Sequence, residues 1–147
     1  HLDPVAEALL IAGDRAQHRA EVLMPALARG EHVVSDRSVY STIAYQGHGR
    51  RLPLDTVRAV NDWALDSRWP DLVVLLDVSH DSAMSRLAHR ALDRFEREDD
   101  AFFRRVRDGF HTMATADPAH WVVLDASGDP ESIAGAVRRA VRERLGI

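Results

Sequence analysis

The stretch that decides the fold is Leu72-Val73-Val74-Leu75-Leu76-Asp77-Val78. Apolar residues follow one another in it without the polar alternation of a half-exposed strand, so it predicts a strand that is buried on both faces. Pro70 stands just before it and ends the helical stripe that precedes it. A strand of this kind belongs in the middle of a parallel sheet whose two faces are covered by helices.

Strand-like runs and helical stripes alternate on both sides of this central strand. Two further strands are predicted at His32-Val33-Val34 and at Trp121-Val122-Val123-Leu124. Apolar residues at helical spacing predict helices over about 4–28, 38–46, 57–65, 81–88, 103–113 and 133–141, and the glycines of 47–51 predict a loop. This alternation predicts an α/β fold, a three-layer parallel sheet with helices on both faces, although three strands make a thin sheet.

The helix ends carry recognisable signals. Asp3-Pro4 and Asp129-Pro130 each place a capping carboxylate before a proline at the first helical position. Pro25 predicts a kink or a break in the first helix, and Gly30 predicts its end. The aromatic and methionine stripe from Phe102 to Met113 is most simply part of the core.

Composition narrows the class of protein. The 147 residues fit a single domain, 1–147, and the 19 basic and 23 acidic residues give a net charge of −4, which argues against a general nucleic-acid binder. The chain has no cysteine, which excludes disulfides and thiolate metal sites. No apolar run approaches a membrane span, no secretory signal is visible, and the eight histidines show no metal-ligand spacing. We therefore expect a cytoplasmic protein that binds neither membranes nor nucleic acid.

Three charged segments are candidates for chemistry. Asp36-Arg37 follows a predicted strand and precedes a helix, a position that suits a phosphate and Mg²⁺, but a capping Asp with a surface Arg fits equally well. Asp14-Arg15 lies in an apolar helix, where spacing favours a structural ion pair over an arginine in a polar pocket. The basic stretch 85–97 is either a solvated face with internal ion pairs or a lid that stabilises a transferring phosphoryl group.

Three motifs taken together are more specific than any of these segments. They are Leu9-Leu10-Ile11-Ala12-Gly13-Asp14-Arg15-Ala16-Gln17-His18, Asp36-Arg37-Ser38-Val39-Tyr40-Ser41-Thr42-Ile43-Ala44-Tyr45-Gln46-Gly47 and Leu92-Asp93-Arg94-Phe95-Glu96. In order and spacing the chain resembles bacterial-type thymidylate (dTMP) kinases over nearly its whole length. The middle motif is the most specific of the three.

The resemblance implies a role for each matching residue. Arg15 would bind the carbonyl edge of thymine, Thr42 and Gln46 the remaining base edge, and Ile11 would cover the ring. Arg37 would bind the monophosphate and act in catalysis, and Tyr45 would pack beside the sugar. The other residues implied are Ser41 for dTMP, Asp36 for Mg²⁺ (possibly through water), Arg86 or Arg90 as the catalytic lid arginine, and Arg94 in the ATP lid.

The sequence also departs from the family pattern. Ile11 stands where the family usually has an aromatic residue, and the lid lacks its usual glycine. The family opens with a G-x-x-x-x-G-K-[ST] phosphate loop, whereas this sequence has no such motif and no lysine. We therefore expect the chain to be the C-terminal two-thirds or so of a P-loop nucleoside monophosphate kinase-like fold, with the N-terminal strands and P-loop segment missing from the given sequence.

The implied activity is transfer of the γ-phosphoryl group of ATP to dTMP, giving dTDP, with Mg²⁺, by a homodimer. Two alternatives stay open. One is another nucleoside monophosphate or deoxynucleoside kinase of related architecture. The other is a non-catalytic nucleotide-binding relative that has lost its P-loop.

Overall fold

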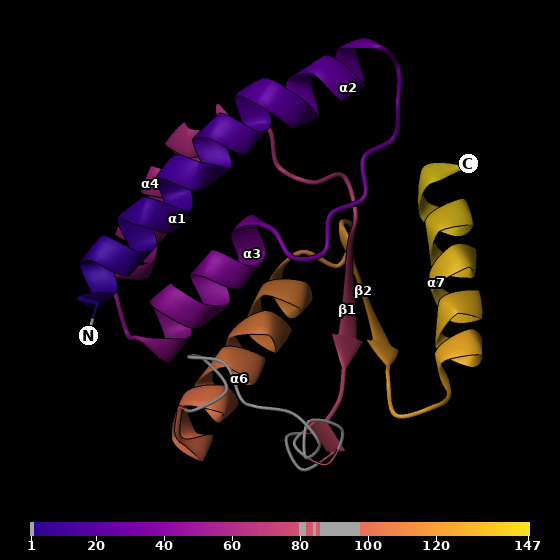
Figure 1. Ribbon diagram of the computed structural model, residues 1–147. Helices are drawn as coiled ribbons and strands as arrows, with labels where there is room; N and C mark the ends of the chain where they lie inside the picture. The colour runs from indigo at the N-terminus through magenta and orange to yellow at the C-terminus, as the bar shows by residue number, and fades with distance from the viewer. Residues whose placement is uncertain (1, 80–81, 84, 86–97) are drawn as a thin grey trace. The chain divides into compact units, whose positions relative to one another are not determined.

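A computed structural model describes residues 2–79, 82–83, 85 and 98–147. The chain divides into two compact units, residues 1–69 and residues 70–147. The first unit is helical, and the second contains the sheet (Figure 1). The predicted helix over 81–88 and the lid over 85–97 lie largely outside the described residues.

The first unit is built from three helical rods. The first comprises α1 (Pro4–His18), η1 (Arg19–Leu23) and α2 (Met24–Ala28); the second comprises α3 (Val39–Thr42) and η2 (Ile43–Gly49); the third is α4 (Leu54–Leu65). Helix α1 contacts α3, η2 and α4, so the second and third rods both pack on the first.

The predicted helix signals of the first rod are confirmed. The Asp3 carboxylate accepts hydrogen bonds from the backbone N–H groups of Val5 (2.8 Å) and Ala6 (3.2 Å). Pro25 is the second residue of α2, two positions after the π-helical turn η1 ends, and this widened turn accommodates a residue that has no N–H to donate and whose ring crowds the preceding turn. Gly30 ends the rod with a φ of +74°.

The loop predicted at 47–51 is wrong for its first part, because the second rod continues to Gly49. The Arg50 N–H donates to the Tyr45 carbonyl at 2.8 Å, a π-type bond that extends the rod by one turn. Gly47 is there for packing: a Cβ on it would lie 2.6 Å from Cδ2 of Leu54 on α4. The glycine therefore permits a close approach of two helical segments.

The strand predicted at His32-Val33-Val34 is also wrong. These residues are irregular, and Val34 is 97% exposed. An apolar run forms a strand only where a neighbour pairs with its backbone, and in the described part of the chain only β1 (Val73–Asp77) and β2 (Trp121–Asp125) pair. Asp36 and Arg37 thus follow an irregular segment instead of a strand end.

The second unit confirms the parallel sheet. Strands β1 and β2 pair in parallel, from Val73 opposite Trp121 to Asp77 opposite Asp125. Helices α6 (Asp100–Ala116) and α7 (Pro130–Leu145) both contact β2, and they lie on opposite sides of the strands in Figure 1. This layering is the α/β arrangement that the sequence predicts.

Packing within the second unit follows the predicted faces with one exception. Phe102, Val106 and Met113 of α6 are buried, and Asp129 caps α7 through the N–H groups of Glu131 and Ser132. Leu76 is 48% exposed, so the expectation that the central strand is buried on both faces is wrong at this position. None of the described helices is both long and apolar enough to cross a membrane.

Candidate functional site

A buried polar cluster surrounds Arg15 where the three rods of the first unit meet. The Arg15 guanidinium donates from Nε to Oδ1 of Asn61 on α4 at 3.0 Å and from Nη2 to Oγ1 of Thr42 on α3 at 2.6 Å. Asn61 and Thr42 are only 1% and 2% exposed. The cluster therefore ties one residue from each of three helices together.

The ion pair that spacing favoured for Asp14-Arg15 is wrong. Asp14 is exposed, and the hydrogen bonds of Arg15 go to an uncharged amide and a hydroxyl. Burial lowers the pKa of Arg15, and the nearby Asp14 charge opposes that change. An arginine stays protonated in proteins nonetheless, so the cluster holds a partly desolvated positive charge.

A second polar pair joins the first rod to the second rod. The Gln46 side-chain amide donates from Nε2 to Oε1 of Glu7 at 2.7 Å, and Nε of Arg50 lies 3.5 Å from the same Glu7 oxygen. Glu7 and Gln46 are buried. A buried carboxylate needs such partners, because desolvating it alone would be costly.

The two polar pairs lie one after the other along one face of α1, with Ile11 between them. Glu7, Ile11 and Arg15 are four residues apart and share a helix face, and Thr42 and Gln46 have the same spacing on the second rod. Ile11, which is half-buried, therefore lies between a Glu7–Gln46 pair and an Arg15–Thr42 pair. The arrangement is an apolar residue flanked on both sides by hydrogen-bonding groups.

Arg37 and Tyr45 form a third part of this region. The Arg37 guanidinium carbon lies 4.6 Å from the centre of the Tyr45 ring, in cation–π geometry. Arg37 has a φ of +66°, which is uncommon for a residue with a side chain, and its carbonyl accepts a hydrogen bond from the Ser35 hydroxyl at 2.7 Å. Asp36 and Arg37 are both exposed, so their charges are available to a ligand.

The structure thus brings most of the predicted base-binding residues into one unit. Ser41 is half-buried on α3, next to Thr42. Arg86, Arg90 and Arg94 lie outside the described residues. Sequence reasoning missed Glu7 and Asn61, whose only signal is a polar residue at a core position of an amphipathic helix.

The second unit contains a further charged cluster that sequence reasoning missed. Arg107 of α6 donates from Nε and Nη2 to the two carboxylate oxygens of Asp77, at 2.8 and 2.7 Å. Nε2 of His111 lies 3.2 Å from Oδ1 of Asp77. The hydrogen bonds from Arg107 lower the pKa of Asp77 to about 2, against an opposing effect of burial and with a smaller contribution from His111. The cluster fixes the end of β1 to α6.

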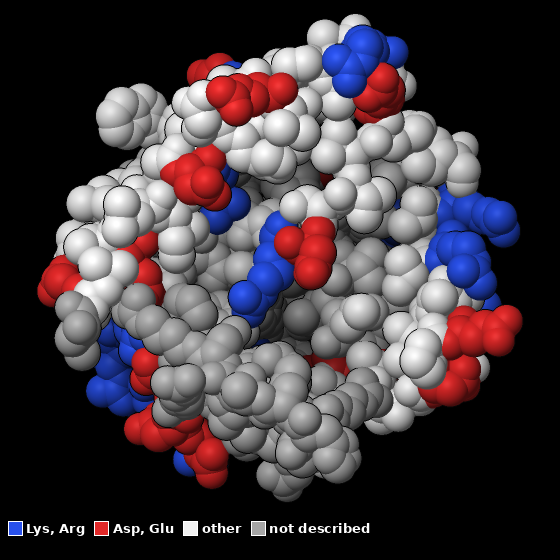
Figure 2. Space-filling view, viewed as in Figure 1, with Lys and Arg blue, Asp and Glu red and all other residues white. Residues whose placement is uncertain are grey.

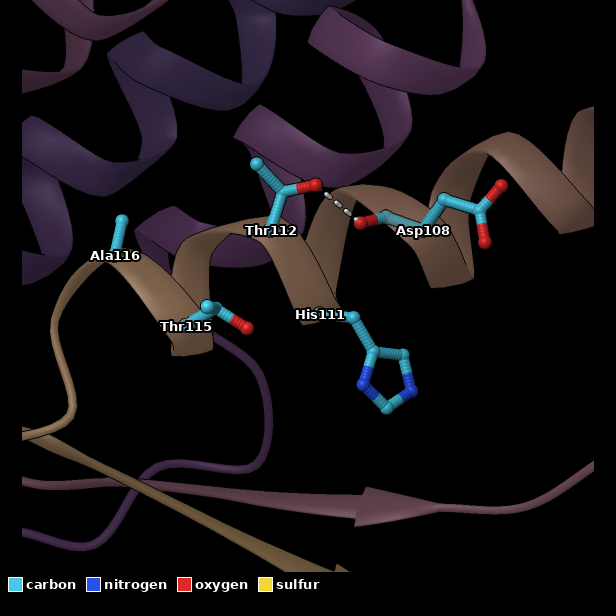
Figure 3. A pocket seen from close by; sticks show the side chains of 5 residues that line it. All are labelled: Asp108, His111, Thr112, Thr115 and Ala116. Carbon is cyan, nitrogen blue, oxygen red and sulfur yellow. Dashed lines mark hydrogen bonds between the residues drawn. The ribbon is translucent and has the colours of Figure 1, made fainter.

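A hollow of about 530 Å³ runs along α6, lined by Asp108, His111, Thr112, Thr115 and Ala116 (Figure 3). The Thr112 hydroxyl donates to the Asp108 carbonyl at 2.8 Å, so one lining group is satisfied within the helix. His111 points toward β1, consistent with its contact to Asp77. Among the described residues, no three His, Asp or Glu side chains are placed to hold a metal ion.

Charged side chains of both signs are visible on the surface drawn in Figure 2. On the face seen in Figure 2, acidic and basic side chains of the described residues are interspersed. This pattern agrees with the small net charge of −4.

Comparison with known proteins assigns the family. The family model for thymidylate kinase matches residues 1–137. The chain belongs to the thymidylate kinase family. The predicted resemblance is therefore confirmed over most of the sequence.

Individual thymidylate kinases show how far the similarity extends. The chain is 47% identical to the thymidylate kinase of Desulforudis audaxviator over 139 residues, which cover 95% of the chain and 63% of that protein. It is 43% identical to the Bifidobacterium longum thymidylate kinase over 140 residues, covering 95% of the chain and 68% of that protein. The chain thus spans roughly two-thirds of the length of these relatives.

A solved thymidylate kinase shares the fold. The crystal structure of the thymidylate kinase from Ehrlichia chaffeensis matches with a TM-score of 0.68 and 29% identity, covering 86% of this chain and 61% of that one. The α/β fold class with a parallel sheet, predicted from sequence alternation, is confirmed by this likeness.

Proposed function

We propose that the protein containing this chain transfers the γ-phosphoryl group of ATP to dTMP, giving ADP and dTDP. Membership of the thymidylate kinase family supports the reaction class. The observation that carries the proposal is the Arg15 guanidinium, bound to Asn61 and Thr42 beside Ile11 on the packed helices of the first unit. Such a cluster provides hydrogen bonds to a base edge next to an apolar surface for its ring.

The base site would use both polar pairs. Arg15 would donate to a thymine carbonyl, and Thr42 and Gln46 would bond the remaining edge, while Ile11 covers the ring and Ser41 lies beside them. The Glu7 contact supports this use of Gln46. It fixes the side-chain amide with its N–H group toward Glu7 and leaves the side-chain oxygen Oε1 to accept a hydrogen bond from the base. A buried polar site rejects bases that leave its groups unpaired.

The phosphate site would be formed by Arg37, with Tyr45 beside the sugar. An arginine fork suits bidentate binding of a phosphate, and the cation–π contact with Tyr45 preorients the guanidinium. The positive φ of Arg37 is the kind of backbone strain that occurs at binding sites.

Asp36 would take part in holding Mg²⁺ through water. Asp36 suits this role, because it is an exposed carboxylate next to the arginine proposed to bind the phosphate. Magnesium usually keeps several waters and uses one or two carboxylates together with substrate phosphates, so a single carboxylate is sufficient. When bound, Mg²⁺ would neutralise charge on the phosphate oxygens.

Catalysis would then depend on positioning and charge. The bond from the γ-phosphorus to the ADP oxygen breaks as a bond forms to a phosphate oxygen of dTMP, a reaction that needs little covalent help from protein. Arg37 would hold the accepting phosphate, and Arg86 or Arg90, with Arg94 in the ATP lid, would stabilise the transferring group.

We also propose that the protein works in the cytoplasm, since its two substrates are small cytoplasmic nucleotides. We propose in addition that it works as a homodimer. Apolar side chains remain exposed on the first helical rod, among them Val5 (52%), Leu9 (55%) and Leu10 (63%), and Trp63 of α4 is 85% exposed. Exposed apolar side chains of this size support a protein interface, and a second copy is the partner proposed.

The test is a coupled ADP-release assay on the intact gene product with ATP, Mg²⁺ and, in turn, dTMP, dUMP, AMP and GMP. We expect preferred turnover of dTMP. Preferred turnover of another monophosphate would show that the protein is a kinase but would refute the base-site assignment. Binding of dTMP without turnover of any nucleotide would favour a non-catalytic relative.

In Arg37→Ala, we expect dTMP binding to weaken strongly, and unchanged affinity would refute the phosphate-site assignment.

A further inference from the structure

Asn61 is a polar residue in the buried interior of a helix, where an apolar residue is usual. It lies within α4, it is 1% exposed, and it is the single asparagine of the sequence. Asparagine is a poor helix former, because its side chain competes with backbone hydrogen bonds. Val57 and Leu65, one turn away on either side, are buried apolar residues of the same helix. An apolar residue would therefore suit the position better if packing alone mattered.

Both ends of the Asn61 amide are engaged. Its Nδ2 donates to the Val57 carbonyl at 2.8 Å, and its Oδ1 accepts from Nε of Arg15 at 3.0 Å. The first bond orients the amide within α4, so the oxygen is the end that faces Arg15. Because Nε is the innermost donor of a guanidinium, this bond fixes the plane of the whole group.

The same geometry determines what the Arg15–Thr42 pair offers. Nη2 of Arg15 donates to Oγ1 of Thr42 at 2.6 Å, so the Thr42 hydroxyl accepts from Arg15 and its own hydrogen is directed elsewhere. The remaining N–H groups of Arg15 and the Thr42 O–H are all donors. A set of donors matches carbonyl oxygens and opposes an amino group at the same place.

We propose that Asn61 is a positioning residue that holds the Arg15 guanidinium in this orientation and thereby sets the preference for a pyrimidine with a carbonyl, instead of an amino group, at C4. This inference rests on the proposed dTMP site. Asn61 itself touches no substrate group in this scheme; it acts through Arg15.

The test measures binding of dTMP and dCMP to the chain by isothermal titration calorimetry, since the two nucleotides differ in the C4 substituent. Asn61→Leu retains the approximate volume and removes both hydrogen bonds. Leu65→Ala is the matched control, because it weakens packing on the same helix and leaves the Asn61–Arg15 bond intact.

We expect Asn61→Leu to lose about tenfold in dTMP affinity, as for one well-placed hydrogen bond to a charged group, with a much smaller change for dCMP. We expect Leu65→Ala to lower the melting temperature without changing the ratio of the two affinities. A folded Asn61→Leu variant with the wild-type ratio, or a Leu65→Ala variant with an equally reduced ratio, would overturn the proposal.

Asn61→Asp decides the question if Asn61→Leu does not fold. The carboxylate keeps an acceptor for Arg15 and loses the bond to the Val57 carbonyl, so we expect the preference for dTMP to persist. Loss of that preference in a folded Asn61→Asp variant would show that an acceptor for Arg15 at position 61 does not set the preference, against the proposal. A wild-type chain without preference for dTMP would instead refute the proposed function itself.

Discussion

Replacing Asp77 by asparagine tests whether the charged cluster of the second unit stabilises the fold. The Asp77 carboxylate receives two hydrogen bonds from Arg107, at 2.8 and 2.7 Å, and lies 3.2 Å from His111. The neutral amide of Asp77→Asn can accept at most one of the two Arg107 bonds and carries no charge. The substitution therefore removes an ion pair that joins the end of β1 to α6.

The pKa of Asp77 gives the magnitude. It lies at about 2, compared with an ordinary value of 3.8, chiefly because of the hydrogen bonds from Arg107. A lowering of this size corresponds to about 2.4 kcal/mol of stability without solvent screening. Because the Arg107 side chain is 49% exposed, screening reduces the contribution, and we expect about 1 kcal/mol.

The pH dependence has a definite sign. A carboxyl whose pKa is lower in the folded than in the unfolded state stabilises the fold above about pH 4, and this contribution is lost as the pH falls through about 2. Urea unfolding at pH 7 should therefore show Asp77→Asn less stable than wild type by about 1 kcal/mol, with most of the difference lost at about pH 2.

The control is Asp71→Asn, which removes the same charge from an exposed position just before β1. We expect it to leave the free energy of unfolding nearly unchanged at both pH values. Asp125, opposite Asp77 on β2, also senses the Asp77 charge, so Asp77→Asn relieves this weaker repulsion as well. An Asp77→Asn protein as stable as wild type at pH 7, or a difference that persists undiminished at pH 2, would refute this reasoning.

Three further substitutions probe the packing. Glu7→Leu leaves the buried Gln46 amide without its acceptor and should cost about 2 kcal/mol in urea unfolding, whereas Glu7→Leu/Gln46→Leu should recover part of the loss, because Arg50 still lacks the Glu7 carboxylate; equal losses would contradict the pairing. Gly47→Ala puts a methyl 2.6 Å from Leu54 and should lower the free energy of unfolding by about 1 kcal/mol, but cost less in a Leu54→Ala background; strict additivity of the two changes would argue against a clash. Asp129→Ala removes the cap of α7 and should destabilise by about 1 kcal/mol in thermal unfolding, and an unchanged melting temperature would show that the cap contributes nothing.

Features that depend on neighbouring residues were predictable from the sequence. The caps Asp3-Pro4 and Asp129-Pro130 and the stop at Gly30 are all present. A cap or a helix stop involves atoms only a few residues apart, so local sequence suffices. The predicted roles of the binding residues are not tested by this geometry and stay predictions.

Features that depend on distant residues were not predictable in the same way. The apolar run at His32 to Val34 predicts a strand, but a strand exists only where another segment pairs with it, and these residues are irregular. Gly47 predicts a loop because glycine favours turns, and only the approach of Leu54 shows its role in packing. Local spacing favours an ion pair of Asp14 and Arg15 over a polar pocket for Arg15, and the structure shows the second alternative.

The sequence by itself therefore determined most of the described helices, the two strands that pair, the α/β class and the motifs that point to thymidylate kinases, since periodicity and residue identity carry this information. Only the tertiary structure decided which side chains meet. Arg15 and Asn61 are 46 positions apart, and Glu7 and Gln46 are 39 apart. Their contacts form because burying the apolar faces of three helices fixes one relative placement of those helices, and the polar residues within the buried faces must then find partners there.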